Sequence, residues 1–242
     1  MTKPLLMCFD FDQTIVQENT DVVACNLLPK DQIEATKVLY SNCNRNWTIY
    51  MRKIFELLHS CGINREAIEN NINSTPATSG FEELLKNLHS HNCEIIIISD
   101  ANSIFIEGWL NHHKLNHTVT KIFTNPSWFD DKGLLNIKEY HYQDWCQLSE
   151  QNLCKGYVLE NYIKERAAEG VHFDKIGYAG DGRNDYCPIL KLSEKDLAFP
   201  REGYSIMKCL KKSESDNIVK AEIIPWKTGA DIWHSLCTKM NL

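Results

Sequence analysis

The stretch Leu5-Leu6-Met7-Cys8-Phe9-Asp10-Phe11-Asp12-Gln13-Thr14 decides the fold of this chain. Its apolar run is typical of a buried strand in a parallel sheet, and two carboxylates follow where that strand ends. In open α/β sheets the ligand crevice lies outside the carboxyl ends of the strands, so we expect Asp10 and Asp12 to face a site. Two like charges this close together require a cation or a shared proton to compensate them.

Beyond this stretch, helical periodicity alternates with short apolar runs. Strands are predicted over 94–100, 122–124, 175–179 and 196–199, a small hairpin turns at 131–133, and helices are predicted over 81–88, 102–110 and 152–170. This alternation predicts an α/β fold, a doubly wound parallel sheet. Residues 16–76 show helical periodicity and no convincing strand, so we expect an all-helical insert there within a core formed by 1–15 and 77–242.

Composition narrows the class of protein. The 242 residues carry a formal net charge of -6 without a basic stripe, which argues against nucleic acid as the main partner and gives no polybasic patch for a membrane surface. No apolar run approaches the roughly 18 to 20 residues that span a bilayer, and no signal peptide is recognisable. We therefore expect a cytoplasmic protein with a small-molecule substrate, while the oligomeric state stays open.

Polar residues follow three of the predicted strands in turn: Asp10 and Asp12, then Ser99 and Asp100, then Asp181 and Asp185. Because parallel strands end at one edge of a sheet, these groups should converge. A calcium-binding loop is the alternative for the first motif. It would need glycine at its sixth position, where this chain has the β-branched Ile15.

These motifs, in this order, resemble those of the haloacid dehalogenase superfamily of aspartyl-phosphate enzymes. Within it the chain is similar to the phosphoethanolamine/phosphocholine phosphatase and pyridoxal-phosphate phosphatase family over nearly its whole length. The resemblance implies a Rossmann-like core with a helical cap inserted after the first strand. It is carried by Phe9-Asp10-Phe11-Asp12-Gln13-Thr14-Ile15, Ile98-Ser99-Asp100-Ala101-Asn102-Ser103, Asn152-Leu153-Cys154-Lys155, Gly180-Asp181-Gly182-Arg183-Asn184-Asp185-Tyr186-Cys187-Pro188 and Phe199-Pro200-Arg201-Glu202-Gly203-Tyr204.

The resemblance implies a phosphomonoesterase in which Asp10 is the nucleophile that forms an aspartyl-phosphate. Asp12 would be the general acid/base, which suits a raised pKa. Ser99 and Lys155 would meet the charge of the transferring phosphoryl group. Each has an alternative, a strand-end cap for Ser99 and a solvated helix lysine for Lys155.

Mg²⁺ is the cofactor that the resemblance implies. Its ligands would be the Asp10 side chain, the Asp12 backbone carbonyl and Asp181, while Asp185 and Asn184 would brace that set.

Thr14 would hydrogen-bond within the first loop or the phosphate pocket, or cap a helix.

The resemblance assigns the substrate head group to Asp21 and Asp100, with Ser99 and Asn102 also on the substrate side. A carboxylate pair can attract an ammonium group, which favours phosphoethanolamine or phosphocholine as substrate. The alternatives are that Asp21 caps a helix of the insert and that Asp100 tightens a turn.

Other substrates and a non-enzymatic function are the alternatives. A ring such as Trp47, Trp128 or Tyr204 could complete a cage around a cation. Pyridoxal 5'-phosphate, the runner-up substrate, would instead need room for a flat ring and a donor to its oxygens. A phosphate-binding or scaffold protein without catalysis is disfavoured because every catalytic group is present.

Ten cysteines are scattered without a C-x-x-C pair, so neither a disulfide framework nor a zinc ribbon is indicated. Cys146 and Cys154 lie near His141, with Ser149 between them. Two thiolates and one histidine are too few for a zinc site, so we expect ordinary cysteines here. Arg183 stands where similar sequences carry a small residue, and we expect it to point to solvent or to the insert.

Overall fold

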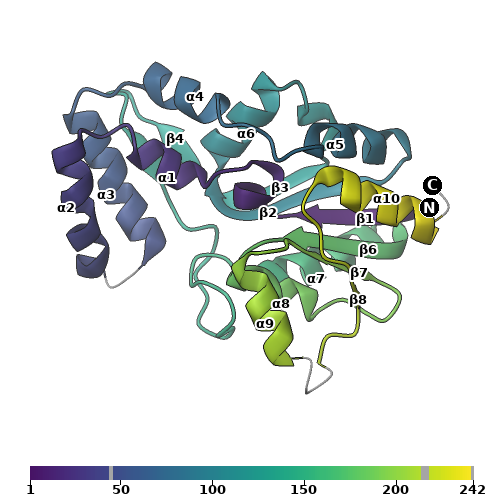
Figure 1. The fold of residues 1–242 in the computed structure, drawn as a ribbon. Helices are drawn as coiled ribbons and strands as arrows, with labels where there is room; N and C mark the ends of the chain where they lie inside the picture. The colour runs from purple at the N-terminus through teal and green to yellow at the C-terminus, as the bar shows by residue number, and fades with distance from the viewer. Residues whose placement is uncertain (44–45, 214–217, 241–242) are drawn as a thin grey trace.

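A six-stranded parallel sheet organises the molecule (Figure 1) in the order β3-β2-β1-β6-β7-β8. The computed structural model describes residues 1–43, 46–213 and 218–240. The strands are β1 (Thr2–Phe9), β2 (Glu94–Asn102), β3 (Lys121–Asn125), β6 (His172–Gly180), β7 (Leu197–Pro200) and β8 (Glu222–Ile223). The predicted doubly wound sheet is confirmed, and β1 lies at its centre.

The sheet is buried on both faces because successive side chains of a strand point to opposite sides. Leu5, Met7 and Phe9 of β1 belong to one apolar cluster, which α5 (Phe81–Ser90), α6 (Ser103–His112) and α10 (Gly229–Met240) cover. Leu6 and Cys8 belong to the second cluster, which α7 (Lys155–Ala168), α8 (Tyr186–Ile189) and α9 (Ser205–Ser213) cover. This arrangement fixes the strand ends rigidly.

In the described part of the chain between β1 and α5, the α-helices are α1 (Thr20–Cys25), α2 (Lys30–Asn42), α3 (Trp47–Ser60) and α4 (Arg65–Asn73). In Figure 1, α2 and α3 lie at the end of the molecule opposite the chain termini. The chain leaves and re-enters the core side by side, since Val16 forms an antiparallel bridge with Ala77. The expected division into a core and an insert over 16–76 stays a prediction.

The predicted hairpin forms from β4 (Ser127–Phe129) and β5 (Leu135–Ile137), which pair antiparallel. Its turn places Gly133 at φ +80°, a conformation that a side chain rarely adopts. Leu135 and Ile137 pack into a third apolar cluster with the helices of residues 20–73. The hairpin therefore packs against the helices of residues 20–73. Among the helices that the structure describes, none is long and apolar enough to cross a bilayer.

Candidate active site

Asp10 is the first residue after β1, and its side chain is almost wholly buried (6% exposed). One carboxylate oxygen accepts a hydrogen bond from the backbone N–H of Phe11 (2.6 Å), and the other accepts one from Nζ of Lys155 (2.5 Å). Burial raises the pKa of Asp10 to about 7, although the positive charge of Lys155 lowers it. The carboxylate is therefore held in one orientation at the edge of the sheet.

Lys155 is the first residue of α7 and is fully buried. Besides Asp10 it donates to Oδ1 of Asp185 (2.8 Å), so one ammonium group joins the acids that follow β1 and β6. Burial alone would lower the pKa of Lys155, but the charges of Asp10 and Asp185 raise it. The solvated lysine that was the alternative is excluded by this burial.

Asp12 occupies a different environment. Its Oδ1 accepts hydrogen bonds from the backbone N–H (3.0 Å) and the hydroxyl (2.7 Å) of Thr20. Burial raises its pKa well above the ordinary value, and the charge of Asp21 raises it further. The two neighbouring acids are thus differently placed, one against a lysine and one against neutral donors.

The loop after Asp12 has a fixed, unusual backbone. Gln13 has φ +54°, in the left-handed region that few residues other than glycine adopt. The buried guanidinium of Arg201 donates to the Gln13 carbonyl oxygen and to Oε1 of Gln17 (2.8 Å). Arg201 follows β7, so a second strand end holds this loop in place.

Asp181 and Asp185 complete an acidic cluster with Asp10, in which the three groups each have an oxygen within 4.8 Å of the others. Burial, followed by the charge of Asp185, raises the pKa of Asp181 to about 9. Asp181 receives a long hydrogen bond (3.5 Å) from the Thr14 hydroxyl, so Thr14 bonds within the site. One lysine cannot neutralise three carboxylates, so the donor set is capable of binding a metal cation.

Asp185 braces this cluster. Its Oδ2 accepts from the backbone N–H groups of Asp181 (3.0 Å) and Gly182 (2.8 Å), while Tyr178 joins Lys155 on Oδ1 (2.8 Å). A Cβ at Gly180 would lie 2.3 Å from Cγ of Asp185, so only glycine permits this approach.

A cavity of about 230 Å³ opens over these groups. The buried Ser99 lines it, and Oγ of Ser99 accepts a hydrogen bond from the backbone N–H of Ala101 (3.3 Å). The other lining residues are Asp10, Asp12, Gln13, Asn19, Asp100, Ala101, Asp181, Gly182, Asn184 and Ser205. The structure thus brings the predicted nucleophile, acid/base and serine to one space.

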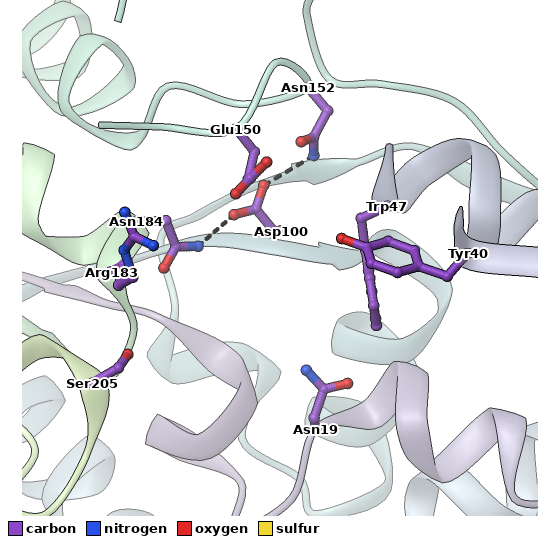
Figure 2. A pocket seen from close by; sticks show the side chains of 9 residues that line it. All are labelled: Asn19, Tyr40, Trp47, Asp100, Glu150, Asn152, Arg183, Asn184 and Ser205. Atoms are coloured by element: carbon purple, nitrogen blue, oxygen red, sulfur yellow. Dashed lines mark hydrogen bonds between the residues drawn. The ribbon is translucent and has the colours of Figure 1, made fainter. Parts of the chain in front are cut away.

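A second cavity, of about 370 Å³, adjoins the first, and Asn19, Asp100, Asn184 and Ser205 line both. Figure 2 shows Tyr40 and Trp47 of the inserted helices on one side of it, facing Asp100 and Asn184 of the core. Glu150, Asn152 and Arg183 complete the lining. This cavity, here called the head-group cavity after the substrate role expected from the sequence for Asp100, lies between α2 and α3 on one side and the sheet edge on the other.

Asp100 is held between two amides in the head-group cavity (Figure 2). Nδ2 of Asn152 donates to its Oδ1 (2.9 Å), and Nδ2 of Asn184 donates to its Oδ2 (2.5 Å). Burial raises the pKa of Asp100, whereas Lys155 and the two amides lower it. Asn184, expected to brace the metal ligands, therefore also orients Asp100.

Asp21 is buried behind the aromatic side of the head-group cavity. Its Oδ2 accepts a hydrogen bond from Nε1 of Trp47 (2.6 Å), and its buried Oδ1 has no hydrogen-bond partner in the described part of the chain. Trp47 is thus fixed at the cavity wall. Of the other candidate rings, Trp128 is exposed on β4 and Tyr204 lies against the guanidinium of Arg201.

Asn102 has a different position from the one expected. It is fully buried, and its Oδ1 caps α6 by accepting a hydrogen bond from the backbone N–H of Phe105 (3.2 Å). The same oxygen also accepts a hydrogen bond from Oγ of Ser127 (2.9 Å). Asn102 is not among the lining residues of either cavity, and its place on the substrate side stays a prediction.

Sequence reasoning missed several residues of the head-group cavity. Asn152 stands in the motif that contains Lys155, so its position three residues before the lysine was a usable signal. Glu150, Asn19 and Tyr40 carry no such signal, because loops and inserted helices bring them to the cavity only in three dimensions. Arg183 is exposed and lines this cavity beside Asn184, across from Tyr40 and Trp47 (Figure 2).

Comparisons with known proteins show the family of this chain. The model of a family described as Putative Phosphatase matches residues 5–240. The chain is 36% identical to the probable phosphatase phospho2 of Xenopus tropicalis, covering 94% of each chain. It is 35% identical to the pyridoxal phosphate phosphatase PHOSPHO2 of Homo sapiens, covering 94% of this chain and 95% of that one. It is 34% identical to the human phosphoethanolamine/phosphocholine phosphatase, with coverage of 94% and 86%.

Solved structures show the same fold. A substrate-bound phosphoserine phosphatase superposes with a TM-score of 0.64 at 21% identity, covering 97% of this chain and 98% of that one. A phospho-aspartyl intermediate analogue of phosphoserine phosphatase gives a TM-score of 0.62 at 21% identity, covering 96% and 99%. The Rossmann-like core expected from the sequence is therefore confirmed.

Proposed function

Because this chain belongs to the Putative Phosphatase family and is a phosphoric monoester hydrolase of the haloacid dehalogenase type, we propose that it hydrolyses small phosphomonoesters through an aspartyl-phosphate on Asp10, with Mg²⁺ as cofactor. The observation that carries this mechanism is the buried contact of Asp10 with Lys155, beside the acids Asp181 and Asp185. The ten cysteines are free thiols, which supports a reducing compartment, the cytoplasm.

In the first step, a carboxylate oxygen of Asp10 attacks phosphorus while the ester oxygen leaves with a proton from Asp12. The raised pKa of Asp12 suits a group that must hold this proton near neutral pH. In the second step, Asp12 takes a proton from water, whose oxygen attacks phosphorus and releases the Asp10 carboxylate and inorganic phosphate. Lys155 and Ser99 provide a cation and a hydroxyl for the phosphoryl oxygens.

The acidic cluster fits a magnesium ion, because carboxylate and carbonyl oxygens are the ligands that this ion prefers. The Asp10 and Asp181 side chains and the Asp12 carbonyl would hold it, and Asp185 would orient Asp181 through its hydrogen bonds to the 181–182 backbone. Bound there, Mg²⁺ would offset the negative charge of the phosphoryl group as its transfer proceeds.

For the substrate, we favour a phosphomonoester with a cationic head group, of the phosphoethanolamine or phosphocholine type. The carboxylates of Asp100 and Glu150 and the rings of Tyr40 and Trp47 line the head-group cavity, a combination that attracts an ammonium group. Asp21 would act through Trp47, whose indole it fixes.

Pyridoxal 5'-phosphate is the second candidate, and Arg183 is the observation that favours it. Its guanidinium lines the same cavity as the two aromatic rings, so a flat pyridine ring could stack there with a donor near its oxygens. The human relatives named above include one phosphatase of each kind.

The test is phosphate release from a panel of monoesters by protein stripped of divalent ions, with and without added Mg²⁺. Phosphocholine, phosphoethanolamine, pyridoxal 5'-phosphate and glycerol phosphate form the panel. We expect turnover that requires Mg²⁺ and a kcat/KM that is highest for the two amines. A highest value for pyridoxal 5'-phosphate would move the assignment to the second candidate, and no turnover of any ester would refute the enzyme.

The nucleophile is tested with Asp10→Asn, which removes the attacking charge while preserving the size of the side chain. We expect loss of turnover, and beryllofluoride should form a stable adduct with the wild-type protein but not with this variant. Asp231→Asn, at the start of α10, is the control and should keep full activity. Turnover surviving in Asp10→Asn would reject the mechanism.

A further inference from the structure

Two cysteines that are close in sequence and one that is distant meet beside the active site. Cys146 lies in the loop before α7, Cys154 is the N-cap of α7, and Cys187 lies in α8. The sulfur of Cys187 is 3.5 Å from that of Cys146 and 3.9 Å from that of Cys154, and all three lie within 4.8 Å of one another. The expectation of ordinary cysteines rested on two thiols, because Cys187 is far away in the sequence.

From this cluster we propose that Cys146, Cys154 and Cys187 form a three-thiolate site for a soft cation, Zn²⁺, separate from the acidic cluster that would hold Mg²⁺. Thiolate sulfur is the donor that selects zinc over magnesium. The proposal does not depend on the substrate or on the aspartyl-phosphate mechanism.

The sulfur spacing fits such an ion. A tetrahedral zinc with bonds of about 2.3 Å to sulfur places its ligands about 3.8 Å apart, close to the two sulfur distances given above. A disulfide would instead need two sulfurs at about 2.05 Å, and it would leave the third thiol without a function.

The surrounding backbone is shaped to bring the sulfurs together. A Cβ at Gly156 would lie 2.6 Å from the sulfur of Cys187, so the absence of a side chain lets α8 approach the start of α7. Cys154 also stands at the N-terminus of a 14-residue helix, where the helix dipole favours a thiolate.

A neutral hydroxyl oxygen lies close enough to be the fourth ligand of a tetrahedral zinc ion. Oγ of Ser149 lies 3.5 Å from the sulfurs of both Cys146 and Cys154. His141 is not placed for this role, because its Nε2 accepts the backbone N–H of Cys154 (2.9 Å). On binding, the three thiols would release three protons and leave a complex with one net negative charge.

Such an ion would link two parts of the catalytic machinery. Cys154 immediately precedes Lys155, and Cys187 follows Asp185 by two residues. Lys155 and Asp185 are themselves in contact (2.8 Å). The ion would thus fix the start of α7 against α8 at the point where these two residues meet.

The test measures Zn²⁺ binding to the reduced, full-length protein and uses Co²⁺ as a spectroscopic probe. We expect one Co²⁺ per chain with a thiolate-to-cobalt charge-transfer band, which Zn²⁺ then displaces. Co²⁺ bound to the acidic cluster would lack this band, so the two sites are distinguishable.

Cys146→Ser is the main variant because Cys146 is partly exposed and its replacement leaves the core intact. It should weaken Zn²⁺ binding at least about tenfold. Ser149→Cys should strengthen binding by at least about the same factor, since it supplies a fourth thiolate. The controls are Cys61→Ser, exposed, and Cys93→Ser, buried, and both should bind as wild type.

Three results would overturn the proposal: no thiolate band with Co²⁺, an unchanged Zn²⁺ affinity in Cys146→Ser, or a Cys146–Cys187 disulfide in protein that binds no metal. The last would identify the cluster as a redox pair instead. Circular dichroism of each variant shows that lost binding does not come from unfolding.

Discussion

Among single residues, Lys155 holds the most demanding electrostatic position. A fully buried ammonium group is tolerated because two carboxylates, from Asp10 and Asp185, contact it directly. The same contacts hold the carboxylates of Asp10 and Asp185 at a fixed separation. The charge of Lys155 therefore both compensates the two buried carboxylates and sets their positions.

Replacing the lysine separates these contributions. Lys155→Met keeps the length of the side chain and removes its charge, so we expect kcat to fall by about 10²- to 10³-fold, the usual cost of losing a transition-state donor. Steady-state phosphate release measures this. Lys164→Met, on the exposed side of the same helix, is the matched control. A kcat near that of wild type would show that Lys155 is structural.

Two oppositely charged side chains in the head-group cavity allow the charge of the preferred substrate to be tested with a pair of variants. Glu150 and Arg183 both line this cavity and are both exposed, so each should change KM by no more than about fivefold. Glu150→Gln should raise KM for phosphocholine, and Arg183→Gln should lower it. Glycerol phosphate should respond little to the Glu150 change. Equal effects of Glu150→Gln on both esters would remove the argument for a cationic substrate.

At the scale of elements, one buried carboxylate connects the start of β2 to α7. Glu94 is 1% exposed and accepts hydrogen bonds from Nε and Nη2 of Arg166 (both 2.8 Å) and from the Tyr162 hydroxyl (2.6 Å). Burial alone would raise the pKa of Glu94, but Arg166 and Tyr162 lower it below its ordinary value of 4.5. The ionised form is therefore the one that stabilises the fold.

Glu94 makes the stability of the fold depend on pH. Because the folded-state pKa of Glu94 is lowered, its contribution to stability is present above pH 4.5 and is lost as the pH falls through the folded-state value. Glu94→Gln should lower the free energy of unfolding at pH 7 by about 2 kcal/mol, with a smaller difference at pH 3. Urea unfolding at both values tests this. Glu165→Gln, a half-exposed partner of Lys121, should have little effect.

The elements that the sequence predicted are those whose signal is local. Apolar runs such as Glu94 to Asp100 and the motif order are legible in one dimension, and the strand ends converge as the parallel sheet requires. The sequence cannot decide the role of Asn102, because a strand-end amide can bind a substrate or cap a helix; in the fold its Oδ1 caps α6. The sequence did not predict that Cys187 joins the cysteine cluster or that Glu150 lines the head-group cavity, because their neighbours there lie in other elements.

At the scale of the whole molecule, the inserted helices and the core share one apolar cluster. Phe55 of α3 packs edge-to-face on Phe105 of α6 (5.9 Å between ring centroids), and Leu135 of the hairpin joins the same cluster. The guanidinium of Arg52 also donates to the carbonyl oxygen of Ile137 (3.2 Å). The helix α3, which carries Trp47, therefore packs against α6 and the β4–β5 hairpin in addition to being covalently connected to them.

This packing predicts that insert and core unfold together. Phe55→Ala should destabilise the protein by about 3 to 5 kcal/mol, and a single thermal transition should remain. Circular dichroism and tryptophan fluorescence, recorded on the same sample, test whether the transitions coincide. Ile49→Ala, partly exposed on α3, is the control. A separate early transition in either variant would show that the insert is an independent unit.

The central place of β1 has a consequence for how the chain folds. β1 precedes the other strands of its sheet in the chain, and its partners are synthesised much later: Phe9 pairs with Ile97 of β2, and Cys8 pairs with Tyr178 of β6. Such long-range pairings close slowly, because loop entropy must be lost before the contacts form. The apolar run of residues 5–9 therefore stays unpaired until most of the chain has been synthesised. During this time its exposed apolar surface can aggregate.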